Sequence, residues 1–125
     1  MFEAIFTITA LVESNGQGQR IFKIFQQREP VNDVAFSSFL ATLYQQEVYR
    51  TLQAGDSLTI TVHLEPPRRE VERTVRFRED QQFEGDGVQE PTADLLPLFS
   101  KMYEQFLQQV HLGDVLTVAF RVQRP

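Results

Sequence analysis

Arginine, histidine and threonine side chains alternate with apolar residues along three stretches of the chain. If these stretches, around 57–65, 71–79 and 115–123, are strands of one sheet, the polar residues share one face of it. The candidate ligand or interface face then comprises His63, Arg76, Arg78, Arg121, Thr61 and Thr117. A guanidinium group offers forked N–H donors that suit a carboxylate or a phosphate. Because threonine favours strands on its own, a simply solvated sheet face is the competing interpretation.

The same residues give little support for catalysis. His63 is the histidine best placed for acid–base chemistry, but its neighbours include no convincing nucleophile. His111 falls in the last turn of a predicted helix, where a protonated imidazole suits the negative end of the helix dipole. The chain contains no cysteine, which excludes disulfides, thiolate metal ligands and cysteine nucleophiles. We therefore predict no catalytic residue and lean towards a non-enzymatic protein.

An acidic stretch at residues 80–91 is the longest segment without a helix or strand pattern. Carboxylates within it and just after it could ligate a hard cation, but their spacing does not follow a calcium-binding loop. The Gly85-Asp86-Gly87 sequence is too short and too acidic to hold a phosphate group. We predict a solvated loop, with no metal and no cofactor.

Chain length, composition and net charge limit the class of protein. The 125 residues fit one domain, residues 1–125, and 42% hydrophobic residues with 11 phenylalanines can build a packed core. The net charge of −5 repels phosphate backbones, so nucleic acid is disfavoured as a partner. The apolar N-terminal run ends at Glu13, short of the roughly 20 residues that a membrane span needs. We expect a soluble, cytoplasmic protein that does not enter a membrane.

The N-terminal segment is predicted to form a β-hairpin. Strands are expected at residues 2–13 and 20–27, joined by a turn at Asn15-Gly16. Both parities of the first strand carry apolar residues, so both of its faces need a cover, and single exposed apolar residues are the alternative. Contiguous apolar surface on one face usually marks a contact. The candidate apolar interface comprises Ile5, Leu11, Ile21 and Phe25.

A stretch that ends one helix and begins one strand occurs twice. Apolar residues at three- and four-residue steps predict two amphipathic helices. The helices stop at Gly55-Asp56 and Gly113-Asp114, where glycine can adopt a left-handed conformation, and each stop leads into a strand that opens Leu-Thr. We interpret the chain as a duplicated β-α-β unit, with copies at about 20–65 and 69–123. Similar helix-end chemistry without common origin is the alternative.

This order of elements predicts the fold class. Two β-α-β units in series are typical of the ferredoxin-like sandwich, an α+β fold in which two helices cover one face of an antiparallel sheet. The N-terminal strand would be an addition to that plan. The sequence leaves its place in the strand order open.

Fold and composition together favour a binding module. Our leading hypothesis is a non-enzymatic protein that forms a homodimer or a larger homo-oligomer, or docks onto a protein partner, through its sheet face or N-terminal hairpin. The alternative is a small-molecule-binding protein or enzyme of the dimeric α+β barrel type, with His63, Arg76 and Arg121 lining a cavity. The third hypothesis is a nucleic-acid-binding ferredoxin-like domain, which the negative net charge disfavours.

Overall fold

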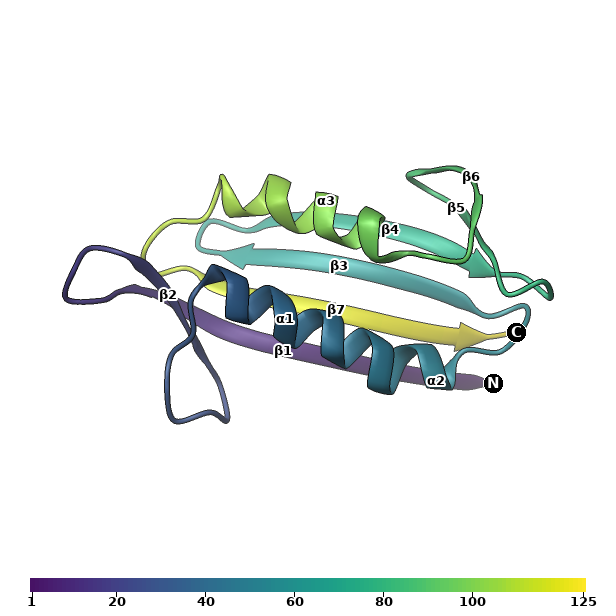
Figure 1. The fold of residues 1–125 in the computed structure, drawn as a ribbon, viewed down its shortest axis with the longest axis horizontal. Coiled ribbons are helices and arrows are strands. Elements are labelled where there is room, and N and C mark those ends of the chain that lie inside the picture. Colours follow the sequence, from purple (N-terminus) through teal and green to yellow (C-terminus); the bar gives the residue numbers. More distant parts are fainter.

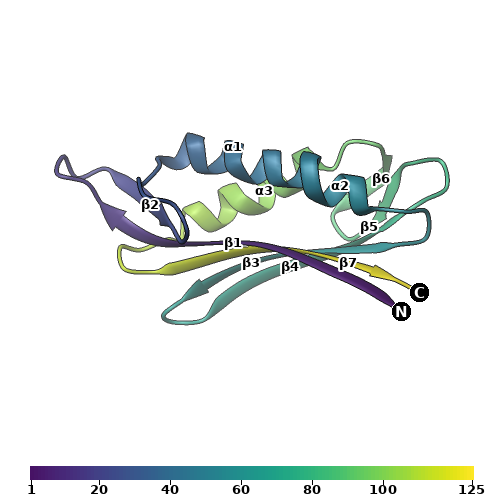
Figure 2. The same cartoon turned by 90° about the horizontal axis from the view of Figure 1, so that it is seen from below.

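The computed structural model describes residues 1–125 and contains one antiparallel sheet with helices on one face (Figures 1 and 2). The predicted α+β class is confirmed. The strands are β1 (Phe2–Ser14), β2 (Arg20–Ile24), β3 (Ser57–Glu65), β4 (Arg69–Phe77), β5 (Phe83–Gly85), β6 (Val88–Thr92) and β7 (Val115–Arg124). The first helix runs through α1 (Asp33–Leu43), the π-helical segment η1 (Tyr44–Val48) and α2 (Tyr49–Thr51), and the second is α3 (Leu96–Leu107). Neither helix has the length and apolar content needed to cross a bilayer.

The strand order in the sheet is β2-β1-β7-β3-β4-β5-β6. The first and last long strands, β1 and β7, are therefore neighbours, and both chain ends lie at the same end of the sheet (Figure 1). The order does not confirm the ferredoxin-like arrangement. In that arrangement the strands that precede the two helices are central neighbours, whereas here the strands that follow the helices, β3 and β7, lie side by side.

The two halves of the chain occupy equivalent places in this order. Strand β1 flanks β7 as β4 flanks β3, and β2 lies outside β1 as β5 lies outside β4. The outer strands also carry a matching buried phenylalanine: Phe22 of β2 lies opposite Val31, and Phe83 of β5 lies opposite Thr92. Strand β1, which we expected to be an addition to the ferredoxin-like plan, lies within the sheet between β2 and β7.

The hairpin between β1 and β2 forms as predicted, but through a longer turn. Asn15 and Gln19 close a five-residue loop, in which the Asn15 side chain accepts the amides of Gln17 and Gln19 at 2.9 Å each. The left-handed residue is Gly18, at φ +78°, rather than Gly16. Strand β2 ends at Ile24, three residues earlier than expected.

The first helix begins at the expected cap, where the Asn32 side chain accepts the Ala35 amide at 2.8 Å. Its buried residues follow every fourth position: Phe36, Leu40, Tyr44, Val48 and Leu52. In an α-helix with 3.6 residues per turn such a row drifts around the axis. The wider π-helical turn at Tyr44–Val48 reduces this drift and returns the row to the sheet. Leu43, which we expected in the middle of the stripe, is only half-buried.

The second helix packs its buried residues beside the first. The Asp94 side chain accepts the Leu96 amide at 3.1 Å, and Pro97 lies in the first turn, where it displaces no helical hydrogen bond. Phe99 contacts Phe120 of β7, with ring centroids 5.3 Å apart. Phe36 of α1 stacks on Phe22 at 4.7 Å, so aromatic rings join both helices to the sheet.

The stretch at 80–91 is not the loop that we expected. It holds the two short strands β5 and β6, which extend the sheet beyond β4. A glycine is required at Gly85, where a Cβ atom would lie 2.8 Å from the Thr74 carbonyl oxygen. Arg73 shares the parity of the buried residues Val75 and Phe77 but is only half-buried, and no bulge places it there, because the β3–β4 register is continuous. It lies on the outer part of β4, and its guanidinium reaches the Glu72 carbonyl at 2.8 Å.

Candidate functional site

The face of the sheet opposite the helices is not covered by any element (Figure 2). At its centre Thr61 of β3 lies opposite Ala119 of β7. On either side of this pair, His63 lies opposite Thr117 and Arg121 lies opposite Thr59. The structure thus brings together four of the six residues proposed for the ligand or interface face: Thr61, His63, Thr117 and Arg121.

His63 is held by acidic neighbours. Its Nε2 lies 2.7 Å from Glu65 Oε1, and its Nδ1 lies 3.1 Å from Glu70 Oε2. Glu70 also pairs with Arg68 at 3.4 Å. Both ring nitrogens of His63 are therefore engaged within the protein, which leaves it poorly placed to accept a proton from a substrate.

Arg121 presents its charge without a carboxylate within ion-pair distance. It is exposed and has Ile5 of β1 on one side and Thr59 of β3 on the other. The Thr59 hydroxyl is 3.1 Å from that of Thr74, so this neighbour is satisfied by β4. Arg121 is thus available to an anionic group of a second molecule.

Arg76 and Arg78 lie apart from this group, at the end of β4. Arg76 is 3.4 Å from Glu84, and Arg78 is 3.0 Å from Asp80. The two arginines border a shallow cavity of about 540 Å³ beside Gly55, which includes neither His63 nor Arg121. The six candidate residues therefore do not form one pocket: four lie together on β3 and β7, and Arg76 and Arg78 border the cavity beside Gly55.

The four residues of the candidate apolar interface also lie on the uncovered face. Ile5 and Phe25 expose 51% and 55% of their surface, while Leu11 and Ile21 are half-buried. They are not one continuous patch, because Lys23 lies opposite Leu11 and Glu13 lies opposite Ile21. Ile5 and Phe25 are the members that remain exposed.

The edge of β1 is a feature that the sequence reasoning missed. Strand β2 pairs only with Ala10–Ser14, and the last bond on this side runs from the Phe25 amide to the Thr9 carbonyl at 2.9 Å. Val12, by contrast, bonds to Gly113 and Asp114 on the β7 side. Because bonding sides alternate along a strand, the N–H and C=O groups of Glu3, Ile5 and Thr7 point away from β7. No strand pairs with them.

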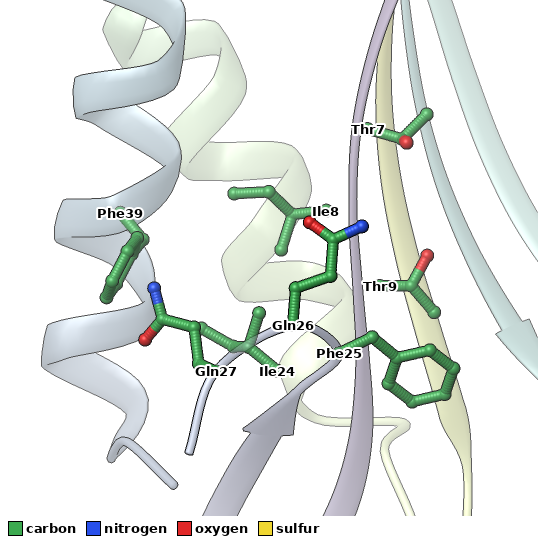
Figure 3. Close-up of a pocket in the computed structure, with 8 residues that line it drawn as sticks. All are labelled: Thr7, Ile8, Thr9, Ile24, Phe25, Gln26, Gln27 and Phe39. Atoms are coloured by element: carbon green, nitrogen blue, oxygen red, sulfur yellow. The ribbon is translucent and has the colours of Figure 1, made fainter. Parts of the chain in front are cut away.

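A cavity of about 350 Å³ adjoins this open edge (Figure 3). It lies where the chain leaves β2, and Gln26 turns there with a φ of +81°. In Figure 3 Ile8 points towards the helices, whereas Thr7 and Thr9 point to the opposite face. The lining residues are Thr7, Ile8, Thr9, Ile24, Phe25, Gln26, Gln27 and Phe39. Their positions in sequence gave no signal of this cavity, because three separate segments form it.

Two tyrosines carry shifted pKa values in the helical layer. Burial raises the pKa of Tyr44, and nearby Tyr49 and Asp94 raise it further. Burial also raises the pKa of Tyr103, with a smaller effect of the same sign from Asp33. Neither hydroxyl has a hydrogen-bonding partner among the protein's groups. Tyr44 borders a cavity of about 340 Å³ between η1 and the start of α3.

No group of three or more histidine, aspartate or glutamate side chains is arranged so that it could hold a metal ion. Comparison with known proteins adds no relative: no protein family, no curated protein and no solved structure matches this chain. The interpretation of the site therefore rests on its own geometry.

Proposed function

We propose that the chain is a non-enzymatic module that self-associates, or docks into a larger assembly, through its sheet. The observation that carries this proposal is β1, which combines an uncovered face and an open edge with exposed Phe2 and Ile5. Unpaired main-chain groups on an apolar edge strand are a template for another strand. Such an edge is suited to pairing with a strand of another protein chain.

The charged edge of β4 supports the same proposal, because it differs from the apolar edge of β1. On β4 the unpaired stretch reads Arg69-Glu70-Val71-Glu72-Arg73, in which four of five residues are charged. Charged residues on an edge strand discourage pairing with another chain. The chain therefore protects one edge and leaves the equivalent edge apolar.

The uncovered face can add specificity. Arg121 has no carboxylate partner, and Glu65 and Glu70 lie on the far side of the central threonines. Charges placed in this way orient a partner and select against wrong ones more than they add affinity. We assign this role to the face that the sequence identified by its arginines and histidine.

The second hypothesis, a small-molecule site of the dimeric α+β barrel type, has less support. It would need one cavity that contains His63, Arg76 and Arg121. His63 is instead engaged by Glu65 and Glu70, and the cavity at Arg76 excludes the other two residues. We therefore retain protein binding as the proposed function.

We also propose that the two halves derive from a duplicated β-α-β unit, although not in the ferredoxin-like strand order. The symmetric places of β1 and β4, and of β3 and β7, support a duplication. So do Gly55 and Gly113, which share a φ of +93°.

The mass in solution tests the proposed function. Light scattering across a wide dilution series should give a mass above that of one chain, and Ile5→Asp should lower it while the circular dichroism spectrum is retained. Val34→Asp is the matched control, because it adds the same charge at an exposed apolar position of α1, on the helical side of the sheet. A mass of one chain at every concentration would contradict self-association.

A further inference from the structure

We infer that the open edge of β1 pairs with β1 of a second copy, antiparallel and with the two Ile5 residues opposite each other. This rests on the proposed function and specifies its partner and contact. The two sheets then continue into each other across a twofold axis at Ile5. The edge concerned is the stretch Phe2–Ile8, which β2 leaves unpaired.

The main-chain groups select this register. Within the stretch, Glu3, Ile5 and Thr7 have outward-pointing N–H and C=O groups. A twofold axis at Ile5 pairs Ile5 with Ile5, and Glu3 with Thr7 of the second copy, so each of these groups finds a partner. Shifting the axis to Phe6 would bring Glu3 opposite Thr9, whose carbonyl already accepts the Phe25 amide. The axis at Ile5 uses the whole stretch without this conflict.

The side chains fit the same register. On the helical face Ala4 lies beside Phe6 of the second copy, so a small residue meets a large one. Phe2 of the second copy lies beside Ile8, which lines the cavity at the end of β2 together with Ile24 and Phe39 (Figure 3). The cavity is therefore placed to receive a phenylalanine that is 39% exposed in the single chain. Glu3 meets Thr7, so no like charges oppose each other.

The end of β2 marks the limit of the contact. In this register Met1 of the second copy would come opposite Thr9, beside Phe25. Met1 lies outside β1 and is fully exposed, so it can turn aside without breaking a strand bond. Strand β2 and the β1 of the second copy then follow one another along the same edge.

Single cysteine variants test the register, because the chain has no cysteine of its own. Opposed residues of a hydrogen-bonded antiparallel pair have Cα atoms about 5.5 Å apart, within the range that a disulfide spans. Ile5→Cys should therefore form a disulfide-linked dimer under mild oxidation. Glu3→Cys alone should not, because its two copies would lie about 13 Å apart, four residues out of register. A mixture of Glu3→Cys and Thr7→Cys should cross-link.

Proline variants test the main-chain bonds without changing the apolar surface. Thr7→Pro removes an outward N–H and leaves the bonds to β7, so the dissociation constant of the dimer should rise about tenfold or more. Glu72→Pro is the matched control: it removes an outward N–H from the charged edge of β4 and should leave dimerisation unchanged. Phe2→Ala should also weaken the dimer, because it empties the cavity beside Ile8.

The outcomes separate this inference from the proposed function. If the protein is oligomeric but Ile5→Cys does not cross-link and Thr7→Pro has no effect, edge pairing is wrong while self-association stands. If every variant and the parent chain are monomeric, edge pairing and self-association both fail, and only docking onto a different protein remains of the proposed function. Cross-linking of Ile5→Cys together with weakening by Thr7→Pro, but not by Glu72→Pro, supports pairing through β1.

Discussion

Asp56 and Asp114 occupy equivalent positions and make equivalent contacts in the two halves of the structure. Each carboxylate is buried and accepts the amide of the residue three positions earlier, at 2.8 Å in both cases. Each also accepts an arginine at 2.9 Å: Arg124 for Asp56 and Arg69 for Asp114. Both arginines donate in addition to a carbonyl at the end of the preceding helix, of Thr51 and Gln109 respectively. Each buried aspartate thus joins a helix end and its own turn to a strand of the sheet, which is β7 for Asp56 and β4 for Asp114.

Removing either carboxylate charge should destabilise the fold by a similar amount. We expect Asp56→Asn and Asp114→Asn each to cost about 2 kcal/mol in free energy of unfolding, below the ~3–5 kcal/mol of a fully buried pair because both arginines are partly exposed. Chemical denaturation measures this. A large cost at one position and none at the other would show that the two turns do not carry equal weight.

The glycines before these aspartates should be equally sensitive to substitution. Gly55 and Gly113 lie in turns that are closed by backbone hydrogen bonds. The Asp56 amide donates to the Gln53 carbonyl, and the Asp114 amide donates to the His111 carbonyl. No atom lies within 4 Å of a Cβ at either glycine, so only the positive φ opposes a side chain. Replacement by alanine should cost about 1 kcal/mol at each site, and asparagine should cost less. Gly16→Ala, at a glycine without positive φ, is the control and should be close to neutral.

The elements of this fold were predictable where one segment determines its own structure. Helix faces, strand parity and the Gly-Asp breaks follow from periodicity and turn chemistry, so their prediction needed no distant contact. Strand order was not predictable, because the pairing of β1 with β7 joins residues at opposite ends of the chain. The short strands β5 and β6 escaped notice because their sequence is acidic and rich in glycine, which masks a strand pattern.

For the candidate site, too, the sequence predicted which residues share a face but not the contacts between strands. Alternation along β3 and β7 placed His63 and Arg121 on one face, but the acidic partners of His63 depend on the β3–β4 register. The open edge of β1 depends on where β2 ends. That end is set by the turn at Gln26, a non-glycine residue with positive φ, for which the sequence carries no signal.

Core substitutions should distinguish the two helices. Phe99 is buried against Phe120 and Tyr103, so Phe99→Ala should cost about 3–5 kcal/mol. Leu43 is half-buried, and its replacement by alanine should cost only about 1 kcal/mol. Val34→Ala, at a position 75% exposed, should be near neutral. Equal losses at Leu43 and Phe99 would mean that the π-helical turn does not set the helix register described above.

Alkaline pH should destabilise the protein through Tyr44 and Tyr103. Burial raises the pKa of both phenols, so the folded state holds the neutral form more firmly than the unfolded state does. Their contribution to stability is fully present below the unfolded pKa of about 10 and is lost as the pH rises above it. Absorbance of tyrosinate should therefore show at most one of the three tyrosines ionising before the chain unfolds.

Phenylalanine substitutions separate this effect from general alkaline damage. Because neither hydroxyl has a protein partner, Tyr44→Phe and Tyr103→Phe should leave the free energy of unfolding at neutral pH within about 1 kcal/mol of the parent. The double variant should lose less stability between neutral pH and pH about 11, since two groups that ionise only on unfolding are gone. If the parent ionises all three tyrosines while its circular dichroism spectrum is unchanged, the two phenols are not shielded by the helical layer.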